Sequence, residues 1–277
     1  MFDKIAKVQE SIIQHGPLSN RIYLMKLADS DIPRLIKSLN KLGEEKKYSK
    51  IIAKVPKKRL PVFKDNGYIL EASIPGFFNG TGDVAFISKY FTKERYREHK
   101  RDRIKEILSI AKKKYNQADE LLDVHPLRIG ESDWTDTEEM AFVYKQVFQT
   151  YPFPIHDPNY LLKTMRNNVR YFYVRDGNRI IALSSSEMEL DLQNVEMTDF
   201  ATLPAYRSRG LAVKLLETME TIMKRCGMRT AYTIARALSA GMNITFAKMG
   251  YTYAGTLTNN TNISGNIESM NVWYKNL

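Results

Sequence analysis

Cysteine is nearly absent from this sequence of 277 residues, which contains Cys226 and no other. A single thiol cannot form an internal disulfide, and no group of Cys and His residues has the spacing of metal ligands. No apolar run approaches the ~20 residues that a membrane-spanning helix needs. The N-terminal segment lacks the apolar block and the cleavage site of a signal peptide. These absences predict a cytoplasmic protein with no metal site and no membrane partner.

The net charge of +11 is confined to the first part of the chain. Residues 1–120 hold 26 Lys and Arg against 15 Asp and Glu, whereas residues 121–277 hold 16 of each. Such a basic segment is compatible with a polyanionic partner such as nucleic acid. The densest run, Lys93–Lys114, interleaves its basic residues with acidic ones at i,i+4 spacing, which favours a solvated helix face. We therefore expect no nucleic-acid partner.

Residues 1–122 are predicted to form a basic α/β domain that ends in a long charged helix. Apolar periodicity predicts strands over Arg21–Leu27, Ile51–Val55, Tyr68–Ile74 and Val84–Phe91, and helices over residues 32–42 and Lys93–Leu122. Asp29, Ser30 and Asp31 are candidate caps of the first helix, and Gly43 is its candidate stop.

Residues 123–277 are predicted to form a second domain with the element order β-α-α-β-β-β-α-β-α-β-β. The strands are expected over residues 126–129, Val169–Arg175, Arg179–Met188, Asn194–Thr202, Thr230–Ile234, Tyr251–Leu257 and Glu268–Tyr274. The helices are expected over Asp136–Phe148, up to about Arg166, over Leu211–Cys226 and over Gly241–Met249.

The strongest local motif is Arg207-x-x-Gly210-x-Ala212, which follows a strand and opens a helix. The first turn of a helix has unpaired N–H groups and the positive end of the helix dipole. Glycine lets the backbone approach a phosphate closely, and arginines add positive charge, so the motif predicts an anion site. On these six residues alone, a tight turn before an ordinary helix is an equal alternative.

In this strand order the motif resembles the acetyl-CoA loop of the GNAT acetyltransferase superfamily, and Phe246–Tyr251 resembles the second signature of that superfamily. The segments TDFATLPAYRSRGLA, RALSAGMNITFAKMGY and GYILEASIPGFFNGTGDVAFISKYF look more closely like the β-lysine N6-acetyltransferases. The resemblance implies a mixed, mostly antiparallel central sheet flanked by helices, and an enzyme that acetylates the N6 amine of β-lysine to form the osmolyte Nε-acetyl-β-lysine. A different amine or a protein lysine as acceptor, or a nucleic-acid-binding regulator with a vestigial acetyltransferase domain, are the alternatives.

The resemblance also implies roles for individual residues. The backbone of Phe200, Ala201 and Thr202 is expected to pair with the pantetheine arm of acetyl-CoA. The residues expected at the pyrophosphate and the rest of the cofactor are Arg207, Ser208, Arg209, Gly210, Leu211, Ala212, Ser239 and Asn243. Glu196 lies eleven residues before Arg207, where the histone-acetylating branch places its general base. A buried ion pair is the alternative role for this carboxylate.

The acceptor is expected to be a small diamino acid. Asp199, Tyr151, Phe153 and Asn260 are the candidate residues that bind it, although Asp199 points away from Glu196 if the strand is regular. A bulge in this strand would bring the two carboxylates to one face. Glu187 and Glu189 lie in the same region of the sequence.

Two positions depart from the superfamily pattern. Ser239 and Phe246 stand where many GNAT enzymes have an asparagine and a proton-donating tyrosine. Either Tyr253 is the acid, or no acid is needed because a thiol with a pKa near ~8.5 leaves as thiolate.

The N-terminal half resembles a shortened second copy of the GNAT C-terminal half. It has no Arg-x-x-Gly-x-Ala loop, so we expect no cofactor site there. The sequence is compatible with a lid over the substrate or with a homodimer contact, and it does not choose between them.

Overall fold

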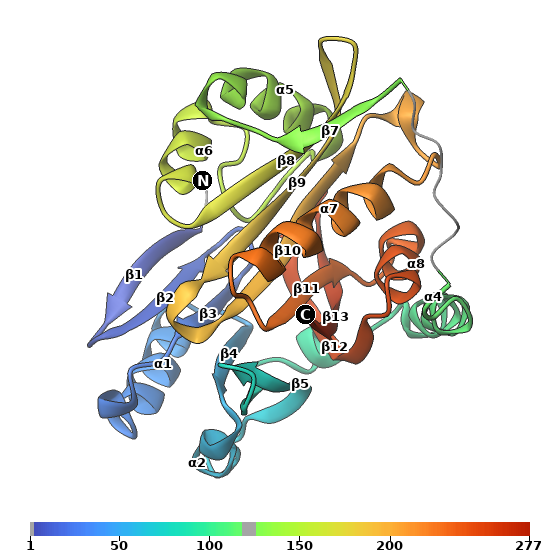
Figure 1. Cartoon of the computed structure of the whole chain (residues 1–277). Helices are drawn as coiled ribbons and strands as arrows, with labels where there is room; N and C mark the ends of the chain where they lie inside the picture. The colour runs from blue at the N-terminus through green and yellow to red at the C-terminus, as the bar shows by residue number, and fades with distance from the viewer. Residues whose placement is uncertain (1–2, 118–125) are drawn as a thin grey trace.

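The computed structural model describes residues 3–117 and 126–277 (Figure 1). The first half contains β1 (Lys4–Val8), β2 (Ser11–Gly16), β3 (Arg21–Lys26), α1 (Arg34–Glu45), β4 (Lys50–Pro56), α2 (Leu60–Lys64), β5 (Ile69–Phe78), β6 (Gly82–Tyr90), α3 (Lys93–Tyr96) and α4 (Arg101–Lys113). The second half contains β7 (Arg128–Glu131), α5 (Thr137–Val147), α6 (Pro158–Met165), β8 (Val169–Asp176), β9 (Arg179–Glu189), β10 (Asn194–Thr202), α7 (Leu211–Arg225), β11 (Thr230–Arg236), α8 (Ala240–Lys248), β12 (Thr252–Ile263) and β13 (Asn266–Asn276).

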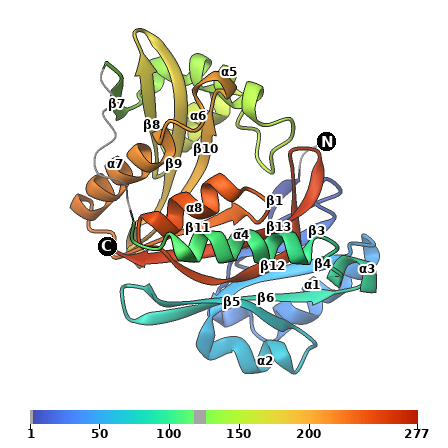
Figure 2. The same ribbon diagram turned by 90° about the vertical axis from the view of Figure 1, so that its right-hand side faces the viewer.

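One mixed sheet connects all thirteen strands of the described residues, in the order β1-β2-β3-β4-β6-β5-β12-β13-β11-β10-β9-β8-β7. Around β10, α7 lies on one side of the sheet and α5 and α6 lie on the other (Figure 2). The side chains of β9 from Ile180 to Ser186 are accordingly buried on both faces. In the described ranges, no helix is both long and apolar enough to cross a membrane.

The two halves repeat the same topology. In the first, β3-α1-β4-α2-β5-β6 gives the strand order β3-β4-β6-β5; in the second, β10-α7-β11-α8-β12-β13 gives β10-β11-β13-β12. In both repeats the first two strands are parallel and the others are antiparallel. The predicted second copy is therefore present, and it extends further back than Arg21 because β1 and β2 pair in the same way as β8 and β9.

The repeats join edge to edge where β5 meets β12, with Gly255 opposite Ala72. A Cβ atom on Gly255 would lie 2.1 Å from the carbonyl oxygen of Glu71, so this close approach requires glycine. One face of the N-terminal half-sheet packs against α1 and α2 around Leu24, Leu35 and Ile51. Its other face joins the core of the C-terminal half. The division into domains 1–122 and 123–277 stays a prediction, and the sheet runs across it.

Two predictions for the N-terminal half were wrong. Asp31 does not cap α1, because its carboxylate accepts hydrogen bonds from the N–H and the hydroxyl of Ser11 at 2.9 and 2.6 Å. Gly43 does not stop α1 either. It lies inside the helix, buried against the ring of Phe91.

The predicted continuous helix from Lys93 is also wrong, since it breaks between α3 and α4. Arg95 turns inward and donates to the carbonyls of Ser19, Asn259 and Asn260. The side-chain amide of Asn259 in turn donates to the carbonyls of Arg95 and Arg97, which ends the first helical segment. The predicted end at Leu122, and with it the domain boundary, lie outside the described residues.

Candidate active site

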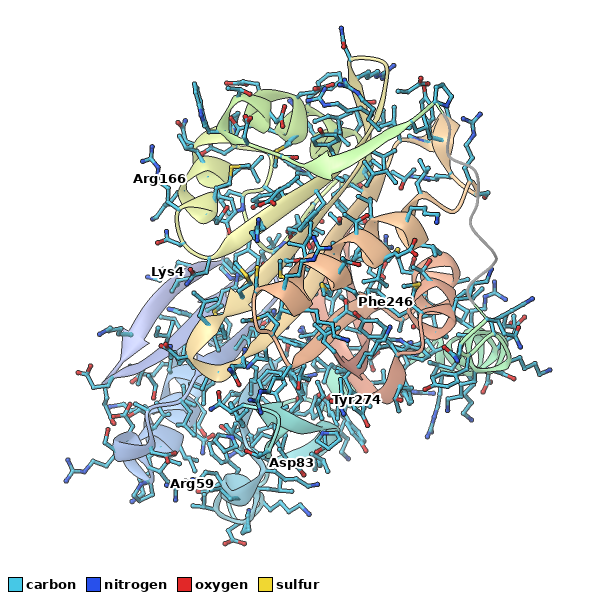
Figure 3. The ribbon with its side chains drawn as sticks, in the orientation of Figure 1. Lys4, Arg59, Asp83, Arg166, Phe246 and Tyr274 are labelled. Atoms are coloured by element: carbon cyan, nitrogen blue, oxygen red, sulfur yellow. The ribbon has the colours of Figure 1, made fainter. Side chains whose placement is uncertain are left out.

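A cavity of about 520 Å³ opens between β10 and β11; we call it the first cavity. The two strands pair in parallel from Asn194 to Glu196 and then continue on either side of the cavity. The loop before α7, the first turn of α8 and the segment of residues 147–151 also contribute to its wall. Phe246 on α8, labelled in Figure 3, also lines it. The predicted cofactor residues in this wall are Phe200, Thr202, Arg207, Ser208, Gly210, Leu211, Ala212 and Ser239.

The loop that leads into α7 turns sharply before the helix begins. Ser208 and Gly210 have φ angles of 62° and 71°, in the left-handed region that glycine adopts most easily. The carbonyl of Gly210 accepts from the N–H groups of Val213 and Lys214, and the N–H groups that precede Val213 have no acceptor within the helix. Arg207 adds a guanidinium whose Nε donates to the carbonyl of Thr202 at 3.3 Å. Open N–H groups, a helix dipole and a cation at one end of a cavity fit a pyrophosphate.

A second cavity of about 340 Å³ adjoins the first. The two share the lining residues Tyr151, Thr198, Asp199, Ile234, Ile263 and Met270. The second cavity lies between β3 and β4 of the N-terminal half and β9, β10 and β11 of the C-terminal half. The residues from the sequence that meet here are Glu196, Asp199, Tyr151, Phe153, Asn260, Glu187 and Glu189. A group bound in the first cavity and a group bound in the second can therefore meet near Asp199.

A β-bulge in β10 places Asp199 in this wall. The register of β10 with β9 shifts between Thr198 and Ala201, and Asp199 has a φ of 55°. Asp199 thus lines the second cavity together with Glu196, as expected for a bulged strand and not for a regular one. Its carboxylate accepts a hydrogen bond from Ser185 Oγ at 2.6 Å and another from the hydroxyl of Tyr151. Burial raises the pKa of Asp199, and these two hydrogen bonds oppose the shift.

Glu196 lies two residues before Thr198, where the bulge begins, and is half-buried in the wall of the second cavity. Desolvation raises the pKa of its carboxyl group and Asp199 adds to the shift, whereas Lys54 and the hydroxyl of Tyr232 oppose it. Burial of the carboxyl group raises the pKa of Glu187 well above its usual value, and the charges of Glu196 and Asp199 add to the shift. Raised pKa values of clustered carboxyl groups are common where an enzyme transfers protons.

Comparison with known proteins decides the family. A model of the acetyltransferase (GNAT) family matches residues 133–251. The chain is also 45% identical over 277 residues to the β-lysine N(6)-acetyltransferase of Methanococcus maripaludis, an alignment that covers 99% of this chain and 98% of that protein. This chain belongs to the GNAT acetyltransferase family. It is an N-acetyltransferase, and the resemblance drawn from the sequence is confirmed.

Two further relatives of this acetyltransferase span most of its length. The β-lysine N(6)-acetyltransferase of Methanosarcina mazei is 31% identical over 262 residues, which cover 87% of this chain and 96% of that protein. The N-acetyltransferase YodP of Bacillus subtilis is 30% identical over 271 residues, which cover 96% of each. Both alignments therefore reach into the N-terminal half.

The side chains of some predicted residues of the acetyltransferase are engaged outside the first cavity. Ala201 is fully buried opposite Leu183, and the guanidinium of Arg209 lies 5.2 Å from the ring centroid of Tyr206. Asn243 is fully buried, and its amide bonds the carbonyls of Arg236 and Ser239 and the side chains of Asn271 and Trp273. Asn243 therefore stabilises the second signature through these hydrogen bonds, and it does not line the first cavity.

The alternative acid, Tyr253, is also engaged. Its hydroxyl pairs with Thr256 Oγ1 at 2.6 Å, and its ring packs on Trp273. Cys226 is exposed at the end of α7, where Arg170 Nη1 lies 3.0 Å from its sulfur.

Sequence reasoning missed the wall that the N-terminal half contributes. Arg21, Tyr23 and Lys54 line the second cavity on the face of β3 and β4 opposite the apolar residues Ile22, Leu24 and Ala53. The signal was the alternation in β3, where Arg21 and Tyr23 share one face. This alternation did not indicate a site, because the polar face of a half-sheet ordinarily meets solvent.

Proposed function

We propose that this acetyltransferase moves the acetyl group of acetyl-CoA to the N6 amine of β-lysine and forms Nε-acetyl-β-lysine. The observation that carries the proposal is the meeting of two cavities at Asp199, one with an anion-binding helix start and one with a cluster of carboxylates. The names of the relatives in Methanococcus maripaludis and Methanosarcina mazei support the acceptor. The arrangement favours direct transfer between two bound substrates.

The first cavity would hold acetyl-CoA, which supplies an activated acetyl thioester. The N–H groups of Gly210, Leu211 and Ala212, with Arg207 beside them, would bind the pyrophosphate. The edge of β10 from Phe200 to Thr202 would pair with the pantetheine arm as an added strand does. A backbone N–H of this edge would donate to the thioester carbonyl oxygen and stabilise the negative charge that forms on it.

Glu196 would act as the general base. A primary ammonium with a pKa near ~10.4 must lose a proton before its nitrogen can attack. Glu196 would accept that proton, directly or through a water molecule, and the C–N bond would form as the C–S bond breaks. Phe246 has no proton to give, so we infer that the leaving thiol departs as thiolate.

The test compares β-lysine, α-lysine and ornithine as acceptors. Moving the ammonium by one carbon leaves a buried partner unpaired at about 1–3 kcal/mol, so α-lysine should be roughly ten- to a hundred-fold worse in kcat/KM. NMR of the product should place the acetyl group on the distal amine. Equal rates for all three acceptors, or acetylation next to the carboxylate, would reject β-lysine as the substrate.

The proposal includes no nucleic-acid partner for the basic half. Along α4 the charges pair with one another, as in Arg103–Glu106 at 2.6 Å and Lys105–Asp102 at 3.8 Å. Filter binding at physiological salt should therefore give weak, sequence-independent retention. Sub-micromolar, sequence-selective binding would favour the regulator instead.

A further inference from the structure

Three buried polar atoms in the wall of the second cavity lack a hydrogen-bond partner within the described residues. They are Gln14 Oε1, Arg21 Nε and Asn260 Oδ1. Their residues are 1%, 4% and 4% exposed, so bulk water does not replace the missing partners. An unpaired buried donor or acceptor destabilises a folded protein. Three of them around one cavity indicate a ligand that supplies one acceptor and two donors.

The charge of Arg21 also indicates a ligand in this cavity. In the described part of the chain, its hydrogen bond goes from Nη1 to the neutral carbonyl of Asn260 at 3.0 Å. Desolvation lowers the pKa of Arg21 to about 10, which leaves it protonated at neutral pH. A buried cation without a carboxylate in contact is unfavourable until an anion arrives.

Lys54 also lines this cavity and forms no ion pair among the described residues, but its charge acts on different groups. Its charge lowers the pKa of both Glu187 and Glu196, and its ammonium lies 5.9 Å from the ring centroid of Tyr232. Arg21 acts on Tyr23, the next residue on its face of β3, which the charges of Glu196, Glu187 and Glu189 also reach. Lys54 therefore belongs with Glu187 and Glu196 in the second cavity, whereas Arg21 is not among the charges that shift the pKa of either carboxyl group.

We propose that the N-terminal half supplies the subsite for the charged head of the acceptor. Arg21 binds the acceptor's carboxylate, and the oxygens of Gln14 and Asn260 accept from the ammonium beside it. One cationic donor and two neutral acceptors complement a zwitterion, and the distal amine then points toward Glu196 and Asp199. This inference rests on the proposed function and extends it, because it assigns substrate selectivity to the half that lacks the cofactor loop.

The test uses steady-state kinetics of the full chain with three acceptors. These are β-lysine, its carboxamide, which lacks the negative charge, and 6-aminohexanoate, which lacks the second ammonium. Arg21→Met should lower kcat/KM for β-lysine by about 10- to 100-fold, as expected for loss of a charge-assisted hydrogen bond. Its kcat/KM for the carboxamide should change less than about threefold, so the preference for the carboxylate disappears.

Gln14→Leu should behave in the complementary way. It should lose the preference for β-lysine over 6-aminohexanoate and keep the preference for β-lysine over the carboxamide. Lys54→Met is the matched control for charge, and it should lower turnover of β-lysine and its carboxamide alike. If Lys54→Met, and not Arg21→Met, removes the preference for the carboxylate, the assignment is wrong.

CoA binding, measured by calorimetry, reports whether each variant is folded, because the first cavity contains no residue of β2 or β3. If Arg21→Met does not bind CoA, Arg21→Lys and Gln14→Leu carry the test, and unchanged selectivity in both rejects the subsite. A wild-type enzyme that does not acetylate β-lysine rejects the proposed function itself. A wild-type enzyme that acetylates β-lysine, with selectivity unchanged in the variants, rejects this inference alone.

Discussion

At the scale of single residues, the proposed base Glu196 lines the second cavity, in which we propose that the amine binds. Desolvation raises its pKa, whereas Lys54 and Tyr232 limit the shift and keep the ionised form accessible. A base acts in its ionised form, so activity should fall as the pH drops through this raised pKa. The acidic limb of the kcat/KM profile should therefore lie above the pH at which an ordinary glutamate titrates.

Replacing Glu196 with Gln should lower kcat/KM roughly 10²-fold or more near neutral pH, the usual contribution of a positioned base. The deficit should shrink at high pH, where more of the free amine is already neutral. Glu217→Gln is the control, since Glu217 is a half-exposed carboxylate of α7 paired with Lys214. A Glu196 variant within a few-fold of wild type at every pH would mean that another group removes the proton.

At the scale of elements, the start of α7 depends on a backbone conformation as much as on side chains. Gly210, at a φ of 71°, is the residue immediately before the helix. Gly210 lines the first cavity, and a β-branched residue at this φ is strained.

Gly210→Val should therefore reduce CoA affinity at least about tenfold in calorimetry, which corresponds to the loss of one charge-assisted hydrogen bond. Gly177→Val is the matched control, because Gly177 has a φ of 56° in the β8–β9 turn and a Cβ there meets nothing within 4 Å. Undiminished affinity of a folded Gly210 variant would exclude this loop from the cofactor site.

The elements also show where sequence reasoning reached its limit. All the elements of the second half were predicted, because each has clear periodicity and turn residues at its ends. The sequence did not predict β2, because this strand buries Ser11, Gln14 and His15 as well as apolar residues. The alternation of apolar and polar residues is therefore missing. The break after α3 depends on Asn259, 164 residues away from Arg95, and no local pattern reports such a contact.

For the candidate site, the motif indicated the loop before α7 and the resemblance indicated Glu196, but neither indicated the opposite wall. Arg21 and Lys54 entered the sequence analysis only through the net charge of the first half, because burial of a cation is set by the other half-sheet. At the scale of the whole molecule, Lys50 is another cation whose burial depends on the other half-sheet. Its ammonium pairs with Glu71 at 3.0 Å, and both side chains are buried. Lys50 also donates to the carbonyl of Thr258 in β12, so this ion pair stabilises the joint between the two halves.

The joint itself provides the last prediction. Gly255→Ala would place a Cβ 2.1 Å from the carbonyl oxygen of Glu71 and 2.7 Å from Ala72 Cα, so β5 and β12 must move apart. The free energy of unfolding should fall by about 2 kcal/mol or more, as for other strained backbone substitutions. Gly227→Ala, at a positive φ with nothing within 4 Å of the added Cβ, should cost about 1 kcal/mol. Because the second cavity lies between the halves and the first does not, the Gly255 variant should raise KM for β-lysine more than it weakens CoA binding. Equal losses at both cavities, or a stability equal to that of the Gly227 variant, would show that the joint does not set the geometry of the acceptor site.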